Sequence, residues 1–331
     1  MDISKLESAF KDEPKFRLAQ AKQAIFKDLI SDWSEASTFS FSLREKLHNE
    51  FPLIIEHQLH FSDDKKTVKA LIELADGEKI EAVLMRHEDR NTVCVSSQIG
   101  CPLKCSFCAT GQMGYKRNLE MPEIVEQILL FSRYLKTEDQ RVTNIVFMGM
   151  GEPLLNYEKV IWAIKYLNQE DTLFLGARRF SISTAGIIEG IQKLADEPME
   201  INLALSLHSL DPHIRSKLMP INLRYPISEV VRSLKSYQDR TRRKIMFEYI
   251  MIDGLNDGEQ AAHDLARTAN QFICVVNLIP CNKTGAFKPS TTANIDRFMK
   301  ILKSRKVEVI QRYNYGSDIA GACGQLANKS R

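Results

Sequence analysis

The sequence predicts an α/β protein built as a partial (β/α)6 barrel, similar in design to a TIM barrel, with a small helical domain in front of it. From about residue 91, short β-branched apolar segments alternate with longer amphipathic segments. This alternation is typical of a parallel sheet covered by helices. Six strand–helix units are too few for a closed eight-stranded barrel. We therefore expect a partial barrel, with a doubly wound open sheet as the alternative.

Length and composition limit the class of protein. A chain of 331 residues, 44% of them hydrophobic, can bury a sizeable core. It contains no run of 18 apolar residues, so no membrane span is expected. The charged first 30 residues lack the apolar core of a signal peptide. Seven cysteines without such a signal fit a reducing compartment, so a cytoplasmic location is expected.

The chain is expected to have three parts, with boundaries near residues 55 and 90. Within 1–55, residues 16–30 have apolar side chains at nearly helical spacing, and a second helix is expected over 42–51 with Ser42 as its N-cap. Residues 56–90 alternate like strands around a turn at Asp76–Gly77 and form a β connection. The remaining part, 91–331, carries the strand–helix alternation.

The elements of this third part follow from its apolar periodicity. Strands are predicted at 92–97, 144–150, 180–186, 201–208, 244–252 and 274–280. Helices are predicted at 121–135, 157–168, 226–238 and 259–270, followed by a last helix at 294–304 and a strand at 307–312. In sheets of this kind, ligands gather at the carboxyl ends of the strands.

Three cysteines follow the first predicted strand in the run CPLKCSFCATG. Cys101, Cys105 and Cys108 have the spacing C-x3-C-x2-C. Iron–sulfur clusters are held by cysteine thiolates. Three thiolates on one loop can occupy three corners of a four-iron cluster, which leaves the fourth iron open to bind a small molecule. A zinc site completed by a distant ligand and a plain electron-transfer cluster are the alternatives.

Polar groups follow other predicted strands at the same edge of the sheet. The second strand runs into MGMGEP, where glycines let the backbone approach a ligand and a glutamate supplies a carboxylate. A simple glycine turn is the alternative interpretation of that motif. The candidate residues at the strand ends are Gly151, Glu152, Ser183, Ser206, Leu207, His208 and Asn282. Their shared position indicates a site for a charged, hydrogen-bonding ligand beside the cysteine loop.

The other cysteines fall into two groups. Cys94 lies seven residues before the loop, and Cys323 lies among small residues in GSDIAGACGQL, which indicates an accessible turn. Cys274 and Cys281 lie in or beside an apolar strand, so they are expected to be inert core residues.

The chain resembles the RlmN/Cfr family of radical S-adenosylmethionine (SAM) RNA methyltransferases. The resemblance rests on CVSSQIGCPLKCSFCATGQMGYKRNL, IVFMGMGEPLLN, ISTAG, LSLHS, RSKLMPIN, NLIPCN and GSDIAGACGQLA, in this order. It implies a radical SAM barrel with a 4Fe–4S cluster on Cys101, Cys105 and Cys108. It also implies that the strand-end residues named above contact SAM.

The resemblance implies roles for three further residues. Cys323 would carry a methyl group, Cys94 would resolve the resulting adduct through a transient disulfide, and Glu81 would accept the ring proton of the substrate. In this mechanism two SAM molecules are used per turnover, and a reductant such as a flavodoxin system restores the thiols.

The implied substrate is adenosine in RNA. Carbon 2 of adenosine in large-subunit ribosomal RNA is the expected target, with transfer RNA as a further substrate. Carbon 8 is the alternative, because RSKLMPINLRYPI resembles the antibiotic-resistance branch, whereas FEYIMIDGLNDG resembles the housekeeping branch. A radical SAM enzyme with a non-RNA substrate and a non-catalytic RNA-binding module with a cluster or zinc are the remaining alternatives.

RNA binding is expected to involve two kinds of surface. The candidate phosphate contacts are Lys116–Arg117, Arg178–Arg179 and Arg240–Lys244. The helical domain over 1–55 is expected to help hold folded RNA, and the protein is expected to be a monomer.

Overall fold

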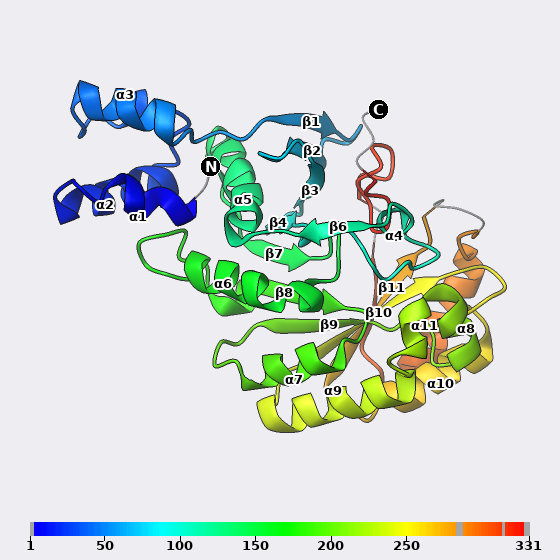
Figure 1. The fold of residues 1–331 in the computed structure, drawn as a ribbon. Helices are drawn as coiled ribbons and strands as arrows, with labels where there is room; N and C mark the ends of the chain where they lie inside the picture. The colour runs from blue at the N-terminus through cyan, green and yellow to red at the C-terminus, as the bar shows by residue number, and fades with distance from the viewer. Residues whose placement is uncertain (1–2, 283–286, 313–314, 328–331) are drawn as a thin grey trace.

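The centre of the computed structural model, which describes residues 3–282, 287–312 and 315–327, is one ten-stranded sheet (Figure 1). Its strand order is β1-β2-β3-β4-β7-β8-β9-β10-β11-β12. The neighbouring strands from β4 to β12 are parallel, whereas β1, β2, β3 and β4 pair in antiparallel fashion. Within the described residues, the edge strands β1 and β12 do not pair with each other. The predicted α/β class with a central, mostly parallel sheet is confirmed.

The parallel strands are largely buried and apolar, except for β12 at the edge of the sheet. They are β4 (Asn91–Cys94), β7 (Asn144–Phe147), β8 (Phe180–Thr184), β9 (Asn202–Ser206), β10 (Ile245–Met251), β11 (Cys274–Pro280) and β12 (Val309–Gln311). The antiparallel extension consists of β1 (His57–Phe61), β2 (Thr67–Glu73) and β3 (Lys79–Arg86). A separate two-stranded sheet consists of β5 (Gln98–Gly100) and β6 (Tyr115–Asn118).

Helices connect successive parallel strands and cover the outside of the sheet (Figure 1). They are α5 (Met121–Lys136), α6 (Tyr157–Leu167), α7 (Ile188–Asp196), α8 (Pro212–Leu218), α9 (Ile227–Thr241), α10 (Glu259–Ala269) and α11 (Thr292–Ser304). Helix α7 was not predicted, although Ile187, Ile191 and Leu194 are buried at helical spacing. In the described part of the chain, none of the helices has the length and apolar character needed to cross a membrane.

The N-terminal helices are α1 (Leu6–Ala9), α2 (Lys15–Lys22) and α3 (Phe41–Glu50). The N-cap of α3 is Ser40, not the expected Ser42. Ser40 has an extended backbone, and its hydroxyl accepts a hydrogen bond from the Leu43 amide at 3.4 Å. The helix therefore begins at Phe41, which places Ser42 within its first turn.

This helical segment packs directly on the body of the protein. The guanidinium of Arg133 in α5 donates to the Ile30 carbonyl at 3.1 Å, and the rings of Phe26 and Tyr166 meet edge to face with centroids 5.6 Å apart. Buried apolar residues of the N-terminal helices belong to the same core as those of the sheet. The N-terminal segment and the sheet are therefore stabilised by one continuous core.

Candidate active site

The cysteine loop is held in a tight conformation between β5 and the short helix α4 (Ala109–Gln112). Gly100 has φ +72°, and a Cβ atom there would lie 1.9 Å from the Gly114 carbonyl oxygen. Only glycine fits this position. The Cys101 amide donates to the Gly114 carbonyl at 2.8 Å, and the Cys108 amide donates to the Cys105 carbonyl at 3.1 Å. The backbone thus folds back on itself and brings the three cysteines onto one compact turn.

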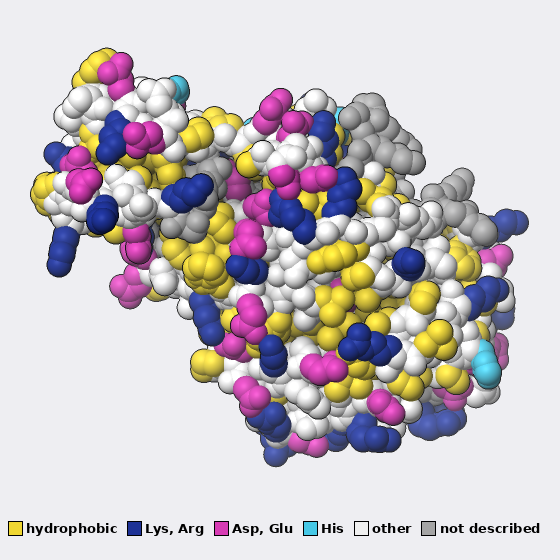
Figure 2. All heavy atoms as spheres, in the orientation of Figure 1, with side chains coloured by type: hydrophobic (Ala, Val, Ile, Leu, Met, Phe, Trp, Pro, Cys, Tyr) yellow, Lys and Arg dark blue, Asp and Glu magenta, His cyan; other side chains and the backbone are white. Residues whose placement is uncertain are grey.

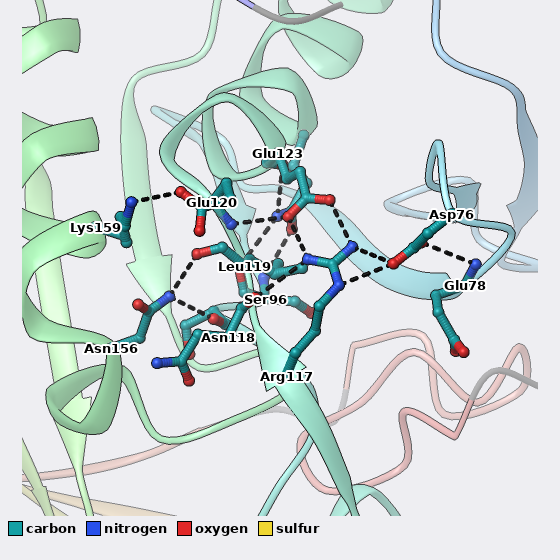
Figure 3. Close-up of polar contacts among 12 residues, drawn as sticks. Asp76, Glu78, Ser96, Arg117, Asn118, Leu119, Glu120, Glu123, Asn156 and Lys159 are labelled. Carbon is teal, nitrogen blue, oxygen red and sulfur yellow. Dashed lines mark hydrogen bonds and ion pairs between the residues drawn. The ribbon is translucent and has the colours of Figure 1, made fainter. Parts of the chain in front are cut away.

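Strand β6 anchors the loop to the rest of the protein through Arg117 (Figure 3). The guanidinium contacts the carboxylate of Asp76, in the turn between β2 and β3, at 2.7 Å. It also binds Glu123, in the first turn of α5, through two hydrogen bonds of 2.8 Å. The hydrogen bonds from the guanidinium to Glu123 and Asp76 raise the pKa of Arg117 above the ordinary value of an arginine. Arg117 therefore connects the cysteine loop to two separate elements.

The donor set of the loop fits an iron–sulfur cluster. Burial raises the pKa of the Cys101 thiol to about 12 and raises that of Cys105 as well. A thiolate in this place therefore needs positive charge from a bound group. Among the described residues, there is no group of three His, Cys, Asp or Glu side chains close enough together to hold a single metal ion. A four-iron cluster instead takes its thiolates on separate irons.

Glu152 follows β7 and is buried beside the loop. Its two carboxylate oxygens accept hydrogen bonds from the Leu154 amide at 3.1 Å and the Ala185 amide at 2.8 Å. Burial raises the pKa of Glu152 to about 7 despite these donors. An ammonium group placed against this carboxylate would favour the ionised form, which suits the amino group of SAM. Gly151 has φ +103°, and a Cβ atom there would lie 2.6 Å from the Gln98 side chain.

The next two strands bring Ser183, Ser206 and His208 to the same edge. The two serine hydroxyls lie 3.4 Å apart on the neighbouring strands β8 and β9. His208 has φ +58°, and its ring meets that of Phe107 in the cysteine loop edge to face at 4.8 Å. Its Nδ1 accepts from the Ile250 amide at 3.1 Å, so the Nε2 atom carries the proton of the neutral ring. Burial lowers the pKa of His208 to about 3.

Arg215 in α8 has no exposed surface and fixes the ends of two strands. Its guanidinium donates to the carbonyls of Ala185 at 2.7 Å and Ser206 at 2.9 Å, and also to the carbonyl of Leu207. No local sequence signal marks this role, because a single arginine within a short helix looks like an exposed residue. Its position shows that it orients the backbone around the predicted SAM contacts Ser206 and Leu207.

The segment that carries Cys323 docks on the cysteine loop. The Ala109 amide donates to the Gly324 carbonyl at 2.7 Å, and the Thr110 hydroxyl donates to the Leu326 carbonyl at 2.7 Å. The Asn282 side chain donates to the Cys323 carbonyl at 2.9 Å. Figure 1 shows this C-terminal segment beside α4. Asn282 thus contacts the backbone of the Cys323 segment.

One cavity of about 550 Å³ brings the reactive cysteines together. Cys94 from the end of β4, Cys108 from the loop and Cys323 all line it. The Cys323 side chain is exposed to the cavity although protein surrounds it. Burial raises the pKa of both the Cys94 thiol, to about 12, and the Cys323 thiol, whereas the nearby Arg312 opposes the rise in each. Two thiols and one expected cluster ligand therefore share a single chamber.

Comparison with known proteins identifies the family of this chain. The radical SAM superfamily model matches residues 95–266. A protein of Dictyoglomus turgidum named "Probable dual-specificity RNA methyltransferase RlmN" is 42% identical over 95% of this chain and 91% of its own length. The RlmN of Bacillus anthracis is also 42% identical, over 96% of this chain and 89% of its own length. This chain belongs to the RlmN family of radical SAM RNA methyltransferases.

A solved structure agrees with this assignment. The crystal structure of a radical SAM methyltransferase from Sphaerobacter thermophilus superposes with a TM-score of 0.94 at 40% identity. The match covers 99% of this chain and 98% of that chain. Membership of the radical SAM superfamily implies a 4Fe–4S cluster and SAM, for which the loop cysteines and Glu152 are suitably placed.

Glu81 does not line the cavity within the described residues. It lies in β3 with 1% of its surface exposed, and its Oε1 atom is 2.8 Å from the ammonium of Lys69 in β2. Its Oε2 atom accepts from the Ala327 amide at 2.7 Å. Met85, four residues further along β3, does line the cavity. Side chains four apart on a strand face the same side, so Glu81 is on the cavity side of the sheet but beneath the C-terminal segment.

The basic residues predicted to bind phosphate lie mostly in ion pairs. Lys116 pairs with Glu78 and Lys244 with Glu308, each at 2.6 Å. The remaining pairs are Arg117 with Asp76 and Glu123, Arg178 with Glu200, and Arg240 with Asp196. On the face drawn in Figure 2, basic and acidic side chains are interspersed. Contacts between these residues and RNA would therefore have to replace existing pairs.

Proposed function

We propose that this RlmN-family protein methylates an sp2 carbon of adenosine in RNA through a methyl group carried on Cys323. The observation that supports this most directly is the convergence of Cys94, Cys108 and Cys323 on one cavity. A generic radical SAM enzyme needs the cluster ligands but has no use for two further thiols. The names of the relatives, which are RNA methyltransferases, support RNA as the substrate.

The residues of the chain divide the chemistry between them. When bound, the cluster and SAM supply a 5′-deoxyadenosyl radical for hydrogen abstraction. Cys101, Cys105 and Cys108 would hold the cluster. Gly151, Glu152, Ser183, Ser206, Leu207, His208 and Asn282 would hold SAM. The apolar wall of the cavity would keep water away from radical species.

Cys323 and Cys94 would act in sequence. The Cys323 thiolate would take a methyl group from one SAM molecule by displacement. A hydrogen atom would then be removed from that S-methyl group by the radical that the bound cluster and a second SAM molecule would supply. The methylene carbon radical would then add to the adenine ring, and the adduct would lose the ring proton to a base and one electron to the oxidised cluster. The Cys94 thiolate would finally attack the Cys323 sulfur, so that the carbon–sulfur bond breaks, a disulfide forms, and the released carbon takes up a proton to become the methyl group. A reductant such as a flavodoxin system supplies the electron for SAM cleavage and reduces the disulfide.

Glu81 is the proposed acceptor of the ring proton. It lies on the cavity side of β3, and the Lys69 ammonium balances its charge. Because the Ala327 amide occupies one carboxylate oxygen, direct proton transfer requires the segment around Ala327 to shift. RNA that enters the cavity is suited to cause this shift, since the segment also forms part of the cavity wall.

We propose carbon 2 of adenosine as the position, in large-subunit ribosomal RNA and also in transfer RNA. The phrase "dual-specificity" in the names of the relatives favours two RNA classes. Carbon 8 is the second candidate, because RSKLMPINLRYPI resembles the resistance branch. The N-terminal helices are proposed to help hold the RNA, and the protein is proposed to work in the cytoplasm as a monomer.

The function is tested by replacing the resolving thiol. With Cys94→Ala, the step that releases the methylated base has no nucleophile, so a covalent adduct between Cys323 and RNA should accumulate in place of product. Denaturing gels and mass spectrometry of the adduct measure this. Cys274→Ala is the matched control, because Cys274 lies at the start of β11 and does not line the cavity; it should release product normally. Free product from Cys94→Ala at the normal rate would refute the proposed role.

A further inference from the structure

A polar group in the otherwise largely apolar cavity wall has no role in the chemistry described above. It consists of Glu248 on β10, Asn277 on β11 and Arg312, which follows β12. Glu248 and Asn277 lie directly opposite each other in the parallel ladder. Asn277 and Arg312 line the cavity, as does Met246, two residues before Glu248 on the same face. The group therefore lies on three adjacent strands and faces the chamber of the cysteines.

Glu248 fixes the orientation of the Asn277 side chain. The Nδ2 atom of Asn277 donates to the Oε1 atom of Glu248 at 2.8 Å. A carboxylate oxygen can only accept from the amide nitrogen, so the carbonyl oxygen of the amide must point the other way. Asn277 Oδ1 accepts no hydrogen bond from any described residue. The cavity thus meets a hydrogen-bond acceptor in a defined place.

Arg312 supplies donors beside this acceptor. Its Nη2 atom lies 3.4 Å from Glu248 Oε1, and its side chain is 32% exposed. Its Nη1 atom also lies 3.9 Å from the sulfur of Met148. These two long contacts leave most of the five guanidinium N–H groups available to a ligand. Within the described residues, the second oxygen of Glu248 has no hydrogen-bond partner, and the residue is 2% exposed. An ion pair that only stabilises the fold would normally use both carboxylate oxygens. The single shared oxygen of Glu248 therefore indicates that this residue orients the side chains of Asn277 and Arg312.

We propose that Asn277 and Arg312 bind the polar edge of the target base and select adenine, with Glu248 as the residue that positions both. This inference rests on the proposed function and deepens it. Adenine presents an amine donor next to a ring-nitrogen acceptor, and asparagine and arginine can match that pair. Enzymes that act on an extruded base read it by such hydrogen bonds. Hypoxanthine has a carbonyl oxygen where adenine has its amine, so it would face the Asn277 oxygen with a second acceptor.

The experiment compares two RNA substrates that differ only at the target base, which is either adenine or hypoxanthine. For the wild-type protein, kcat/KM for the adenine RNA should be at least about 100-fold higher than kcat/KM for the hypoxanthine RNA, because a site built to hydrogen-bond one group strongly disfavours an analogue that leaves its polar groups unpaired. Asn277→Ala removes the acceptor, so this ratio of the two kcat/KM values should fall at least about tenfold. Glu248→Gln frees the amide to rotate and should also lower the ratio.

Two measurements separate base selection from damage to the fold. Methylation of Cys323 by SAM needs no RNA base, so Asn277→Ala and Glu248→Gln should retain it together with their iron content. Arg312→Lys keeps the charge beside Glu248 but loses the planar donors, so it should reduce kcat/KM for the adenine RNA. The control is Glu126→Gln, which changes a buried carboxylate in α5 that does not line the cavity; its ratio should equal that of wild type.

The outcomes are distinct. If Asn277→Ala and Glu248→Gln lower activity on both RNAs equally, the ratio is unchanged and the inference is refuted, because the residues then only support the sheet. If the wild-type protein methylates neither RNA, the proposed function itself fails, and this inference fails with it. A lower ratio with intact Cys323 methylation supports the assignment.

Discussion

At the scale of single residues, the buried pair of Lys69 and Glu81 is the most demanding feature. Their side chains are 2% and 1% exposed, and the ammonium nitrogen lies 2.8 Å from the carboxylate oxygen. Removing two charges from water costs several kcal/mol for each ion, and only close pairing with further hydrogen bonds offsets this cost. Glu81 receives such a bond from the Ala327 amide. The pair therefore couples β2 and β3 to the C-terminal segment.

Lys69→Met should destabilise the protein by roughly 3–5 kcal/mol, because it removes the ammonium that lies 2.8 Å from the buried Glu81 carboxylate. Urea unfolding of the wild type and the variant measures the change in the free energy of unfolding. The matched control is Lys193→Met, which breaks the exposed pair of Lys193 and Glu158 and should cost at most about 1 kcal/mol. Equal stability of Lys69→Met and wild type would mean that the ion pair of Lys69 and Glu81 makes no net contribution to the free energy of unfolding.

At the scale of elements, the site is held by contacts between short segments rather than by long helices. Helix α4 has four residues, yet its backbone touches both the cysteine loop and the segment that carries Cys323. A Cβ atom at Gly111, within α4, would lie 2.9 Å from the Cys105 amide nitrogen. The neighbouring atom is backbone and cannot move aside by a change of rotamer.

Gly111→Ala should therefore displace the cysteine loop at a cost of about 1–3 kcal/mol, the range typical of overpacking. We expect lower iron content per chain after anaerobic reconstitution with iron and sulfide. Gly258→Ala is the matched control, because a Cβ atom at that glycine meets nothing within 4 Å. If Gly111→Ala binds as much iron as wild type, the close packing of α4 on the loop is not needed for the cluster.

At the scale of the whole molecule, local periodicity was sufficient to predict the parallel strands and most of the helices between them, although it missed α7. The rule that parallel strands end at a common edge also placed Glu152, Ser183 and His208 near the cysteine loop. Two other features depend on contacts between segments far apart in the sequence. The docking of Cys323 on α4 and the burial of Arg215 and Lys69 leave no local pattern, because a lysine or arginine in an amphipathic segment normally faces solvent.

The N-terminal segment is part of the packed body of the protein. Trp33 is 1% exposed, and its indole nitrogen donates to the Phe51 carbonyl at 2.7 Å. The guanidinium of Arg133 in α5 reaches the Ile30 carbonyl. Deleting residues 1–55 would uncover apolar surface on α5 and α6, so weaker RNA binding after deletion would not show that this segment contacts RNA. Substitutions of exposed side chains on α2 and α3 therefore test RNA binding by this segment more cleanly than deletion does.

Cys323 is proposed to deliver a methyl group to adenosine in RNA. The most direct test is mass spectrometry of nucleosides from ribosomal and transfer RNA treated with the anaerobically reconstituted protein, SAM and a reductant. We predict 2-methyladenosine with the wild-type protein and none with Cys323→Ala. 8-Methyladenosine instead would retain the mechanism and move the position to carbon 8. Methylated adenosine formed equally well by Cys323→Ala, or no methylated adenosine with the wild type, would contradict the claim.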